Sequence, residues 1–369
     1  MMAFESRLDT IRIGMIGCGG IAHGKHLPSL KKIAGVEMVA FCDLILERAE
    51  TAAREYGVPQ AKTYVDYREM LLDSSIDVIH VLTPNASHAP LTIAALEAGK
   101  HVMCEKPMAK TAEDARAMLA AAKKTGKLLT IGYQNRFRAN STVLHALCQD
   151  GVLGEIYYAK ALALRRRAVP TWGVFLDEEQ QGGGPLIDIG THSLDLALWM
   201  MDNYRPRTVL GVAHHQLSRR DNAVNAWGRW DPKTFTVEDS AFGMVTMENG
   251  ANIMVESSWA INSLQTGEAQ VVLCGSEAGA DMAEGGLRLN GEEHRRLYTK
   301  IVDLEVGGVD FYEGERELNS SDLEARQWIQ AVREGRSPVV KPEEALVVTE
   351  ILEAIYESAR TRQAVTLGV

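Results

Sequence analysis

The fold is decided by Ile11-Arg12-Ile13-Gly14-Met15-Ile16-Gly17-Cys18-Gly19-Gly20-Ile21-Ala22, a short apolar run that breaks into glycines. Gly17 lets the chain leave a strand in a tight turn, Gly19 lets backbone N–H groups approach a pyrophosphate, and Ala22 stands where a helix packs on the strand. A second apolar run ends in Asp43, where a carboxylate accepts hydrogen bonds from a ribose diol and repels a 2′-phosphate. An ordinary Gly-rich turn explains neither the flanking elements nor this acid. The pattern therefore predicts a βαβ unit that binds a dinucleotide, NAD in preference to NADP.

Strand and helix patterns alternate through the first third of the chain. Further strands are expected at 36–41, 77–82, 101–104 and 128–132, and helices at 46–56, 66–72, 90–98 and 111–124. Strands that are apolar along nearly their whole length and joined by helices imply a parallel sheet covered on both faces. Such sheets bind ligands at the carboxyl ends of their strands, so the segments to watch are Thr83–His88 and Glu105–Pro107.

The pattern changes after about residue 150. Short alternating or β-branched runs lie between turn signals at 154–164, 208–213, 239–247, 251–258, 268–274 and 287–290, with helices expected at 190–201, 321–334 and 342–362. Glu248-Asn249-Gly250 is the clearest hairpin turn among them. We therefore expect an α/β protein, with an N-terminal Rossmann domain (1–133) and a C-terminal α+β domain (134–369) built on a large, mainly antiparallel open sheet.

Composition excludes several classes of partner. The formal net charge of the 369 residues is −10, and Arg165-Arg166-Arg167 is the one short basic run, so nucleic acid is not an expected partner. Met1–Thr10 lacks the apolar core of a signal peptide, and no run approaches the length of a membrane span. The five cysteines include no C-x-x-C pair, which suits a reducing compartment and offers no zinc site. A cytoplasmic protein without membrane contact is expected.

Four motifs in order carry a family resemblance. They are the Gly-rich turn Gly17–Ala22, Thr83-Pro84-Asn85 with His88, Glu105-Lys106-Pro107, and the run Gly184-Pro185-Leu186-Ile187-Asp188-Ile189-Gly190-Thr191-His192-Ser193-Leu194-Asp195. With them the chain resembles, over nearly its whole length, the glucose-fructose oxidoreductase, inositol dehydrogenase and rhizopine-catabolism (Gfo/Idh/MocA) family. The resemblance implies NAD-dependent oxidation of a secondary alcohol on a sugar, glycoside or cyclitol. It also implies a cis Lys106–Pro107 peptide.

The same resemblance assigns the site residues. Catalytic roles fall to Lys106, Asp188 and His192. Cofactor contacts fall to Gly17, Gly19, Gly20, Ile21, Asp43, Thr83, Asn85, His88, Glu105, Lys106 and Arg136. Substrate contacts fall to Lys106, Arg165, Trp172, Asp188 and His192. A hydroxyl at C3 of a glucoside is the first substrate to test, because the segment from Arg165 to Phe175 is similar to that of glycoside-oxidising members, and inositol is the next.

The residues themselves support this chemistry. Hydride leaves a carbinol carbon only if a base removes the hydroxyl proton. His192 fits this role because an unperturbed imidazole changes its charge near neutral pH. Asp188 stands four residues earlier, on the same face if the segment is helical, and can orient the imidazole or the substrate. Lys106 at a strand end can stabilise a developing alkoxide. The run Gly182-Gly183-Gly184 indicates that the backbone comes close to another group.

Plainer interpretations stay open. His192 could be a core histidine, and Lys106 a surface lysine. Asp195 is most simply a helix-surface or orienting carboxylate, and a metal site at Asp188, His192 and Asp195 lacks a further ligand. His23 and His26 are interpreted as surface or packing residues. Trp172, Trp227, Trp230 and Trp259 could form an aromatic wall for the apolar face of a sugar, although burial is the plainer interpretation of each one.

Two alternatives to the main function also stay open. One is a reductase of a keto-sugar on the same fold, and the other a non-catalytic dinucleotide-binding regulator.

In the run 239–258, Ala241, Gly243, Val245 and Met247 fall on one face of a strand and Phe242, Met244 and Thr246 on the other. Both faces are mostly apolar, and the domain's own helices can cover one of them. A homo-oligomer, a dimer, tetramer or larger, is therefore expected to cover the other.

Overall fold

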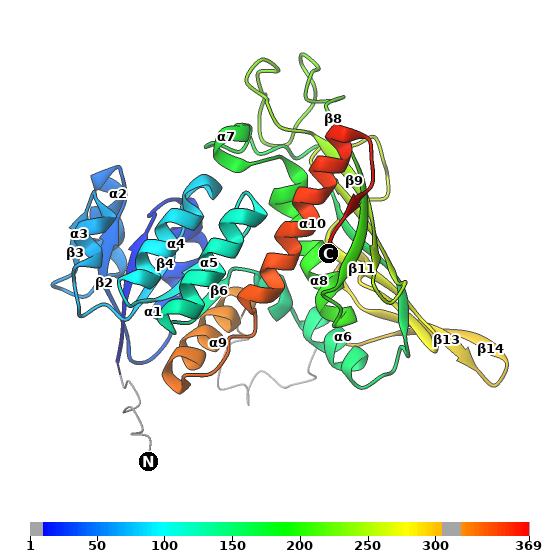
Figure 1. Ribbon diagram of the computed structural model, residues 1–369, viewed down its shortest axis with the longest axis horizontal. Helices are drawn as coiled ribbons and strands as arrows, with labels where there is room; N and C mark the ends of the chain where they lie inside the picture. The colour runs from blue at the N-terminus through cyan, green and yellow to red at the C-terminus, as the bar shows by residue number, and fades with distance from the viewer. Residues whose placement is uncertain (1–9, 305–318, 369) are drawn as a thin grey trace. The chain divides into compact units, whose positions relative to one another are not determined.

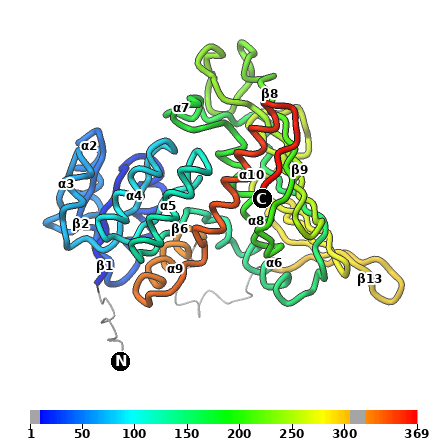
Figure 2. Tube along the Cα trace, viewed as in Figure 1, coloured from blue at the N-terminus to red at the C-terminus, as the bar shows by residue number. Residues whose placement is uncertain are grey.

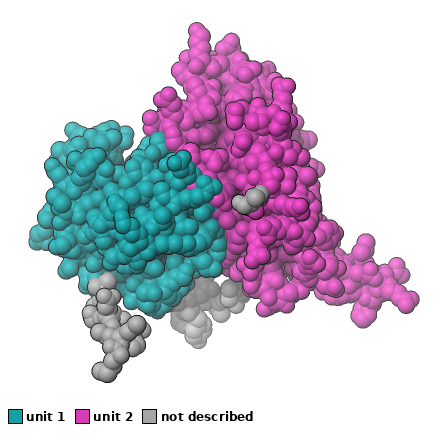
Figure 3. Space-filling model, in the orientation of Figure 1, with its two compact units in different colours: residues 1–109, 113–134, 317–346 teal, residues 110–112, 135–316, 347–369 magenta. Residues whose placement is uncertain are grey.

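The computed structural model describes residues 10–304 and 319–368. The chain forms two compact units (Figure 3). Unit 1 comprises Met1–Ala109, Glu113–Gln134 and Glu317–Leu346, and unit 2 comprises Lys110–Ala112, Asn135–Arg316 and Val347–Val369. Most of the N-terminal segment that argued against a signal peptide, residues 1–9, lies outside the described residues. No helix within the described residues is long and apolar enough to span a membrane.

Unit 1 is built on a six-stranded parallel sheet in the order β3-β2-β1-β4-β5-β6. The strands are β1 (Ile11–Ile16), β2 (Val36–Cys42), β3 (Lys62–Tyr64), β4 (Val78–Val81), β5 (His101–Cys104) and β6 (Leu129–Ile131). The chain order reverses between β1 and β4, so the carboxyl ends of these two strands flank the point where such sheets bind dinucleotides. The predicted Rossmann sheet is confirmed.

Helices alternate with these strands (Figures 1 and 2). They are the π-helical η1 (Ala22–His26), α1 (Leu27–Lys31), α2 (Leu46–Tyr56), α3 (Tyr67–Leu71), the 3₁₀ turn η2 (Asn85–Ser87), α4 (His88–Glu97) and α5 (Ala112–Thr125). α9 (Ser320–Glu334) also belongs to unit 1, because Trp328 and Ile329 lie in the same buried cluster as Ile13 and Leu27. The C-terminal part of the chain thus contributes a helix to the first unit, which the expected division into 1–133 and 134–369 did not include.

Unit 2 contains a nine-stranded sheet in the order β14-β13-β12-β11-β7-β10-β9-β8-β15. The strands are β7 (Ile156–Leu164), β8 (Pro206–His214), β9 (Ser240–Met247), β10 (Asn252–Ser258), β11 (Gly267–Gly275), β12 (Ala278–Asp281), β13 (Arg288–Glu293), β14 (Arg296–Ile301) and β15 (Val365–Thr366). β10 runs parallel to β7, and the other pairs are antiparallel. The predicted mainly antiparallel sheet is confirmed, with β12, β14 and β15 as strands that the sequence pattern did not reveal.

Helices lie along one face of this sheet (Figure 1). The remaining helical segments are η3 (Gln134–Phe137), α6 (Ala139–Gln149), α7 (Glu178–Gln181), the π-helical η4 (Leu186–Gly190), α8 (Thr191–Met201), η5 (Ala283–Gly285) and α10 (Pro342–Thr361). α10 packs so closely that a Cβ at Gly211 or Gly243 would lie within 2.7 Å of an Ile355 atom. Small residues on β8 and β9 therefore allow the helix to approach the sheet.

Candidate active site

The Gly-rich turn after β1 has the geometry of a pyrophosphate cradle. Gly17 has a φ of +94°, and a Cβ there would lie 2.5 Å from the backbone oxygen of Leu82, so only glycine fits. At Gly19 and Gly20 a Cβ would meet no described atom within 4 Å. Ile21 is 42 % exposed, whereas Ala22 is fully buried. The turn thus leaves open space above its backbone, as a bound dinucleotide requires.

Asp43 lies directly after β2 and beside this turn. Its Oδ2 accepts a hydrogen bond of 2.9 Å from the N–H of Cys18, and its Oδ1 accepts one of 2.9 Å from the N–H of Ile45. The next two residues, Leu44 and Ile45, carry no cation that would pair with a 2′-phosphate. These residues fit NAD better than NADP.

The two loops after β4 and β5 are joined by His88. Its Nδ1 lies 2.7 Å from the carbonyl oxygen of Pro107, and its Nε2 lies 2.9 Å from that of Thr83. The ring is buried, which lowers its pKa. His88 therefore positions the Thr83 loop, which includes the partly buried Asn85, against the Lys106–Pro107 peptide. That peptide is cis, as predicted.

Glu105 belongs to a buried cluster of charges in unit 1. Its Oε1 accepts a hydrogen bond from Lys25 at 2.7 Å and lies 2.8 Å from His26 Nε2, while its Oε2 accepts from the N–H of Lys106 at 3.0 Å. Burial alone would raise the pKa of Glu105, but Lys25 and His26 hold it well below its usual value. The ionised carboxylate fixes the backbone of the partly buried Lys106.

Glu324 of α9 closes this cluster on the other side of Lys25. The Lys25 ammonium lies 2.8 Å from Glu324 Oε2, and Glu324 Oε1 is buried without a hydrogen-bond partner among the described residues. Burial raises the pKa of Glu324 to about 7. No motif in the sequence pointed to Lys25 or Glu324, and His26 was interpreted as a surface or packing residue. His26 is instead a buried partner of Glu105.

In unit 2, Asp188 and His192 lie four residues apart on one continuous helical run. η4 carries Asp188 and passes directly into α8, whose first turn carries the buried His192. Side chains four residues apart on a helix share a face. The Nε1–H of Trp259 donates a hydrogen bond of 3.0 Å to Asp188 Oδ2. Trp259 is fully buried, so it holds the carboxylate from within the core.

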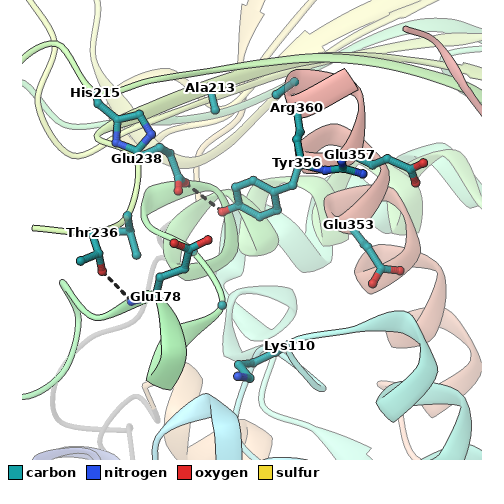
Figure 4. A pocket seen from close by; sticks show the side chains of 14 residues that line it. Lys110, Glu178, Ala213, His215, Thr236, Glu238, Glu353, Tyr356, Glu357 and Arg360 are labelled. Carbon is teal, nitrogen blue, oxygen red and sulfur yellow. Dashed lines mark hydrogen bonds between the residues drawn. The ribbon is translucent and has the colours of Figure 1, made fainter. Parts of the chain in front are cut away.

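The glycine run before η4 meets two groups that the sequence did not identify. A Cβ at Gly183 would lie 2.1 Å from the hydroxyl of Tyr356, and one at Gly184 would lie 2.2 Å from the backbone oxygen of Glu238. Figure 4 shows the side chains of Glu238 and Tyr356 directed toward each other. The predicted close approach of backbone at this run is therefore confirmed.

Asp195 and Arg136 form a buried ion pair in unit 2. Arg136 Nε donates to Asp195 Oδ2 at 2.9 Å and Nη2 donates to Oδ1 at 2.5 Å, and both side chains are excluded from solvent. Asp195 is fully buried, so its interpretation as a helix-surface residue is wrong. The ion pair with Arg136 compensates the cost of burying its charge. The guanidinium also lies 5.3 Å from the Trp199 ring. Arg136 thus anchors α8, and its expected contact with the cofactor stays a prediction.

Arg165 and Trp172 lie in an aromatic region of unit 2. The Arg165 guanidinium is paired with Glu268 through two hydrogen bonds of 2.6 Å and lies 5.2 Å from the Trp227 ring. Trp172 is 52 % exposed and contacts Trp227 edge to face. Of the four tryptophans considered for an aromatic wall, Trp259 is buried, Trp230 is partly buried, and Trp172 and Trp227 are exposed. Among the described residues, no cluster of His, Cys, Asp and Glu could hold a metal ion.

Comparison with known proteins decides the family. A family model described as "Oxidoreductase family, NAD-binding Rossmann fold" matches residues 11–133, and its companion, the C-terminal alpha/beta domain, matches residues 146–367. The chain belongs to the Gfo/Idh/MocA oxidoreductase family. The predicted family, the oxidoreductase class and the NAD cofactor are confirmed.

Members of the Gfo/Idh/MocA family with known activities are similar to this chain. D-glucoside 3-dehydrogenase of Escherichia coli (strain K12) is 36 % identical over 97 % of both chains. Inositol 2-dehydrogenase of Salmonella typhimurium (strain LT2) is 30 % identical over 67 % of both. The crystal structure of aldose-aldose oxidoreductase from Caulobacter crescentus, complexed with glycerol, has a TM-score of 0.78 at 26 % identity and covers 97 % of this chain and 100 % of that one. The fold is thus shared over 97 % of this chain.

Proposed function

We propose that this oxidoreductase removes hydride from a secondary hydroxyl of a sugar, glycoside or cyclitol, with the C3 hydroxyl of a glucoside as the first candidate. The observation that carries the proposal is the placement of Asp188 and His192 four residues apart on the run from η4 into α8, with the carboxylate held by Trp259. The similarity to D-glucoside 3-dehydrogenase over 97 % of both chains supports the choice of substrate.

His192 is the general base in this proposal. An imidazole within hydrogen-bond reach of the hydroxyl accepts its proton, and the carbon can then release hydride. Asp188, held by Trp259, orients the imidazole or a neighbouring substrate hydroxyl. Bound NAD would accept the hydride.

Lys106 stabilises the alkoxide character that develops on the same oxygen. An ammonium group lowers the energy of a developing negative charge. Glu105 fixes the Lys106 backbone by accepting its N–H, and His88 fixes the next residue by its bond to the Pro107 carbonyl. Gly17, Gly19, Gly20 and Asp43 hold the dinucleotide in the same proposal.

The proposed reaction is tested by screening alcohols for NADH formation. The panel contains alkyl and aryl glucosides, their 3-deoxy analogues, free hexoses and inositols. A glucoside that yields NADH while its 3-deoxy analogue does not supports the assignment. Activity on inositols alone would move the substrate to cyclitols, and no NADH from any compound would contradict the proposal.

The proposal includes a homo-oligomer formed through the sheet of unit 2. The face opposite α8 and α10 carries Leu210, Val212 and Met244, which are 44 %, 48 % and 38 % exposed. Phe242 and Met254 on the same face are partly buried. A second copy of this face is the simplest cover for such an apolar surface.

A further inference from the structure

Glu238 is a buried carboxylate that the reaction described above does not use. It lies just before β9 and is 4 % exposed. Its Oε2 accepts a hydrogen bond of 2.8 Å from the N–H of Gly184. Its Oε1 accepts one of 3.1 Å from the N–H of Leu186 and one of 2.8 Å from the hydroxyl of Tyr356 on α10. Three donors from two separate segments therefore meet on one carboxylate.

These bonds lie at the start of the segment that carries Asp188 and His192. Leu186 is the first residue of η4. The carbonyl oxygen of Gly184 accepts a hydrogen bond of 3.0 Å from the N–H of Asp188. One residue, Gly184, thus links the Glu238 carboxylate to the backbone of Asp188 through its N–H and its C=O.

We propose that Glu238 and Tyr356 are positioning residues that set the orientation of the Asp188–His192 segment by holding the backbone at Gly184 and Leu186. This inference rests on the catalytic role proposed for Asp188 and His192. It also explains the run Gly182-Gly183-Gly184, since side chains at Gly183 and Gly184 would overlap Tyr356 and Glu238.

The ionised form of Glu238 is the one that holds the segment. A carboxylate has free lone pairs for all three donors, whereas a protonated carboxyl group turns one oxygen into a donor and weakens its bond to an N–H. Burial raises the pKa of Glu238 to about 7, and the bonds from Gly184, Leu186 and Tyr356 oppose that rise. The segment is therefore expected to become better ordered as the pH rises through neutrality.

A cavity of about 670 Å³ borders this pair (Figure 4). The charged or titratable side chains that line it with Glu238 and Tyr356 are Lys110, Glu178, His215, Glu353, Glu357 and Arg360. This set contains two cations, three carboxylates and one histidine, and its members come from several elements. The N–H groups of Gly184 and Leu186 donate to the Glu238 carboxylate, so the hold on the segment acts through Glu238 itself.

The experiment compares three variants in the full-length enzyme. In Glu238→Gln, one acceptor oxygen becomes an NH₂ group, which cannot accept from an N–H. Tyr356→Phe removes one donor and leaves the carboxylate, so the pKa of Glu238 should rise. Glu357→Gln removes an exposed charge from the same cavity and serves as the matched control.

Two readouts are measured for each variant. The first is hydrogen–deuterium exchange of peptides that span residues 184–192, without substrate, from pH 6 to pH 9. The second is kcat and KM over the same pH range. A structural role alone would not shift a pH midpoint or separate kcat from KM.

Glu238→Gln is expected to speed exchange in the 184–192 peptides at high pH and to lower kcat about tenfold or more with KM within about twofold, because a small misplacement of reacting groups is costly. Tyr356→Phe is expected to move the pH midpoint of exchange and of kcat upward, and Glu357→Gln to match the wild type.

Unchanged exchange in both Glu238→Gln and Tyr356→Phe would overturn the inference whatever the activity. If Glu238→Gln does not fold, an unshifted midpoint in Tyr356→Phe overturns it alone. If exchange responds as expected but His192→Ala keeps full activity, the positioning of the segment stands and the proposed function fails.

Discussion

Asp43, at the carboxyl end of β2, accepts hydrogen bonds from the backbone and is also expected to bind the ribose of the cofactor. Its oxygens already accept N–H groups from Cys18 in the Gly-rich turn and from Ile45 beyond it. Each oxygen has a further lone pair, so the carboxylate can also accept from a ribose diol. Because of this double role, changes at Asp43 affect both the shape of the turn and the choice of cofactor.

Asp43→Ala is expected to weaken NAD binding about 10- to 100-fold, the equivalent of ~1.5–3 kcal/mol for hydrogen bonds to a charged group. NADP binding should weaken less or improve, since the repulsion of the 2′-phosphate is lost. Titration calorimetry with both cofactors measures the two affinities. Asp43→Asn, which keeps an acceptor without the charge, separates the two effects. Equal affinities of the wild type for NAD and NADP would contradict the assignment.

His192→Ala is expected to lower kcat by roughly 10² to 10⁴, the usual contribution of a general base. NAD affinity should change little, because His192 is expected to contact substrate and not to hold the dinucleotide. Steady-state kinetics on the best substrate of the alcohol screen, with NAD titration as the control, measure both. Near-normal turnover in this variant would move the base to Lys106 or to a water chain.

Elements whose signal is local could be predicted from the sequence. β1, α2 and β5 have the expected ends because apolar runs and helix stops define them within the segment itself. β12 is four residues long and rich in small side chains, and β14 is mostly exposed, so neither carries a period that stands out. A strand of this kind depends on its partners in the sheet.

Contacts between elements that are far apart in the chain could not be predicted from the sequence. Lys25 and Glu324 are separated by nearly the whole chain, and neither lies in a motif. Glu238 and Tyr356 are likewise far apart in the sequence and lie in no motif. The run Gly182-Gly183-Gly184 indicated only that another group lies close to the backbone there. The motifs could be recognised in the sequence, and the roles of their residues stay predictions, whereas Lys25, Glu324, Glu238 and Tyr356 belong to no pattern that marks them.

Helix α9 contacts the rest of unit 1 through Glu324, which pairs with Lys25 and has a raised pKa. Because burial raises the pKa of Glu324 from 4.5 in the unfolded chain to about 7, the folded protein holds a proton that the unfolded chain loses in this interval. The protonated Glu324 carboxyl is thus favoured in the folded protein, and the free energy of unfolding includes this stabilisation in full below pH 4.5. The stabilisation is lost as the pH rises from 4.5 to 7. The loss is on the order of 3 kcal/mol.

Glu324→Gln should therefore gain stability relative to the wild type as the pH is raised from 5 to 8. Urea unfolding at the two pH values, followed by circular dichroism, measures the difference. Glu47→Gln on α2, an exposed position, is the matched control and should show no such change. A constant difference between Glu324→Gln and the wild type at both pH values would contradict the raised pKa.

At the scale of the whole molecule, the sheet of unit 2 presents one face to its own helices and another that stays partly exposed. β9 shows the expected alternation, with Ala241, Val245 and Met247 buried and Met244 exposed. The period of two along a strand made this division predictable. The division of the chain into units was less predictable than this alternation, because α9 joins unit 1 through packing that no local pattern indicates.

Light scattering of the wild type at micromolar concentration should give a multiple of the 40.5 kDa chain mass. Val212→Asp combined with Met244→Asp places charges on the exposed apolar face and should shift the mass toward one chain. Leu72→Asp, at an exposed apolar position of unit 1, is the control. A wild-type mass equal to one chain would contradict the oligomer.

The most direct test of the proposed reaction follows the hydrogen atom itself. A glucoside that carries deuterium at C3 is incubated with the enzyme and NAD, and the mass of the NADH formed is measured. We expect NADH heavier by about one mass unit, formed more slowly than with the unlabelled glucoside if hydride transfer limits the rate, and no NADH from the His192→Ala variant beyond the residual rate. Unlabelled NADH from this substrate, or none at all while NAD binds normally, would contradict oxidation at C3.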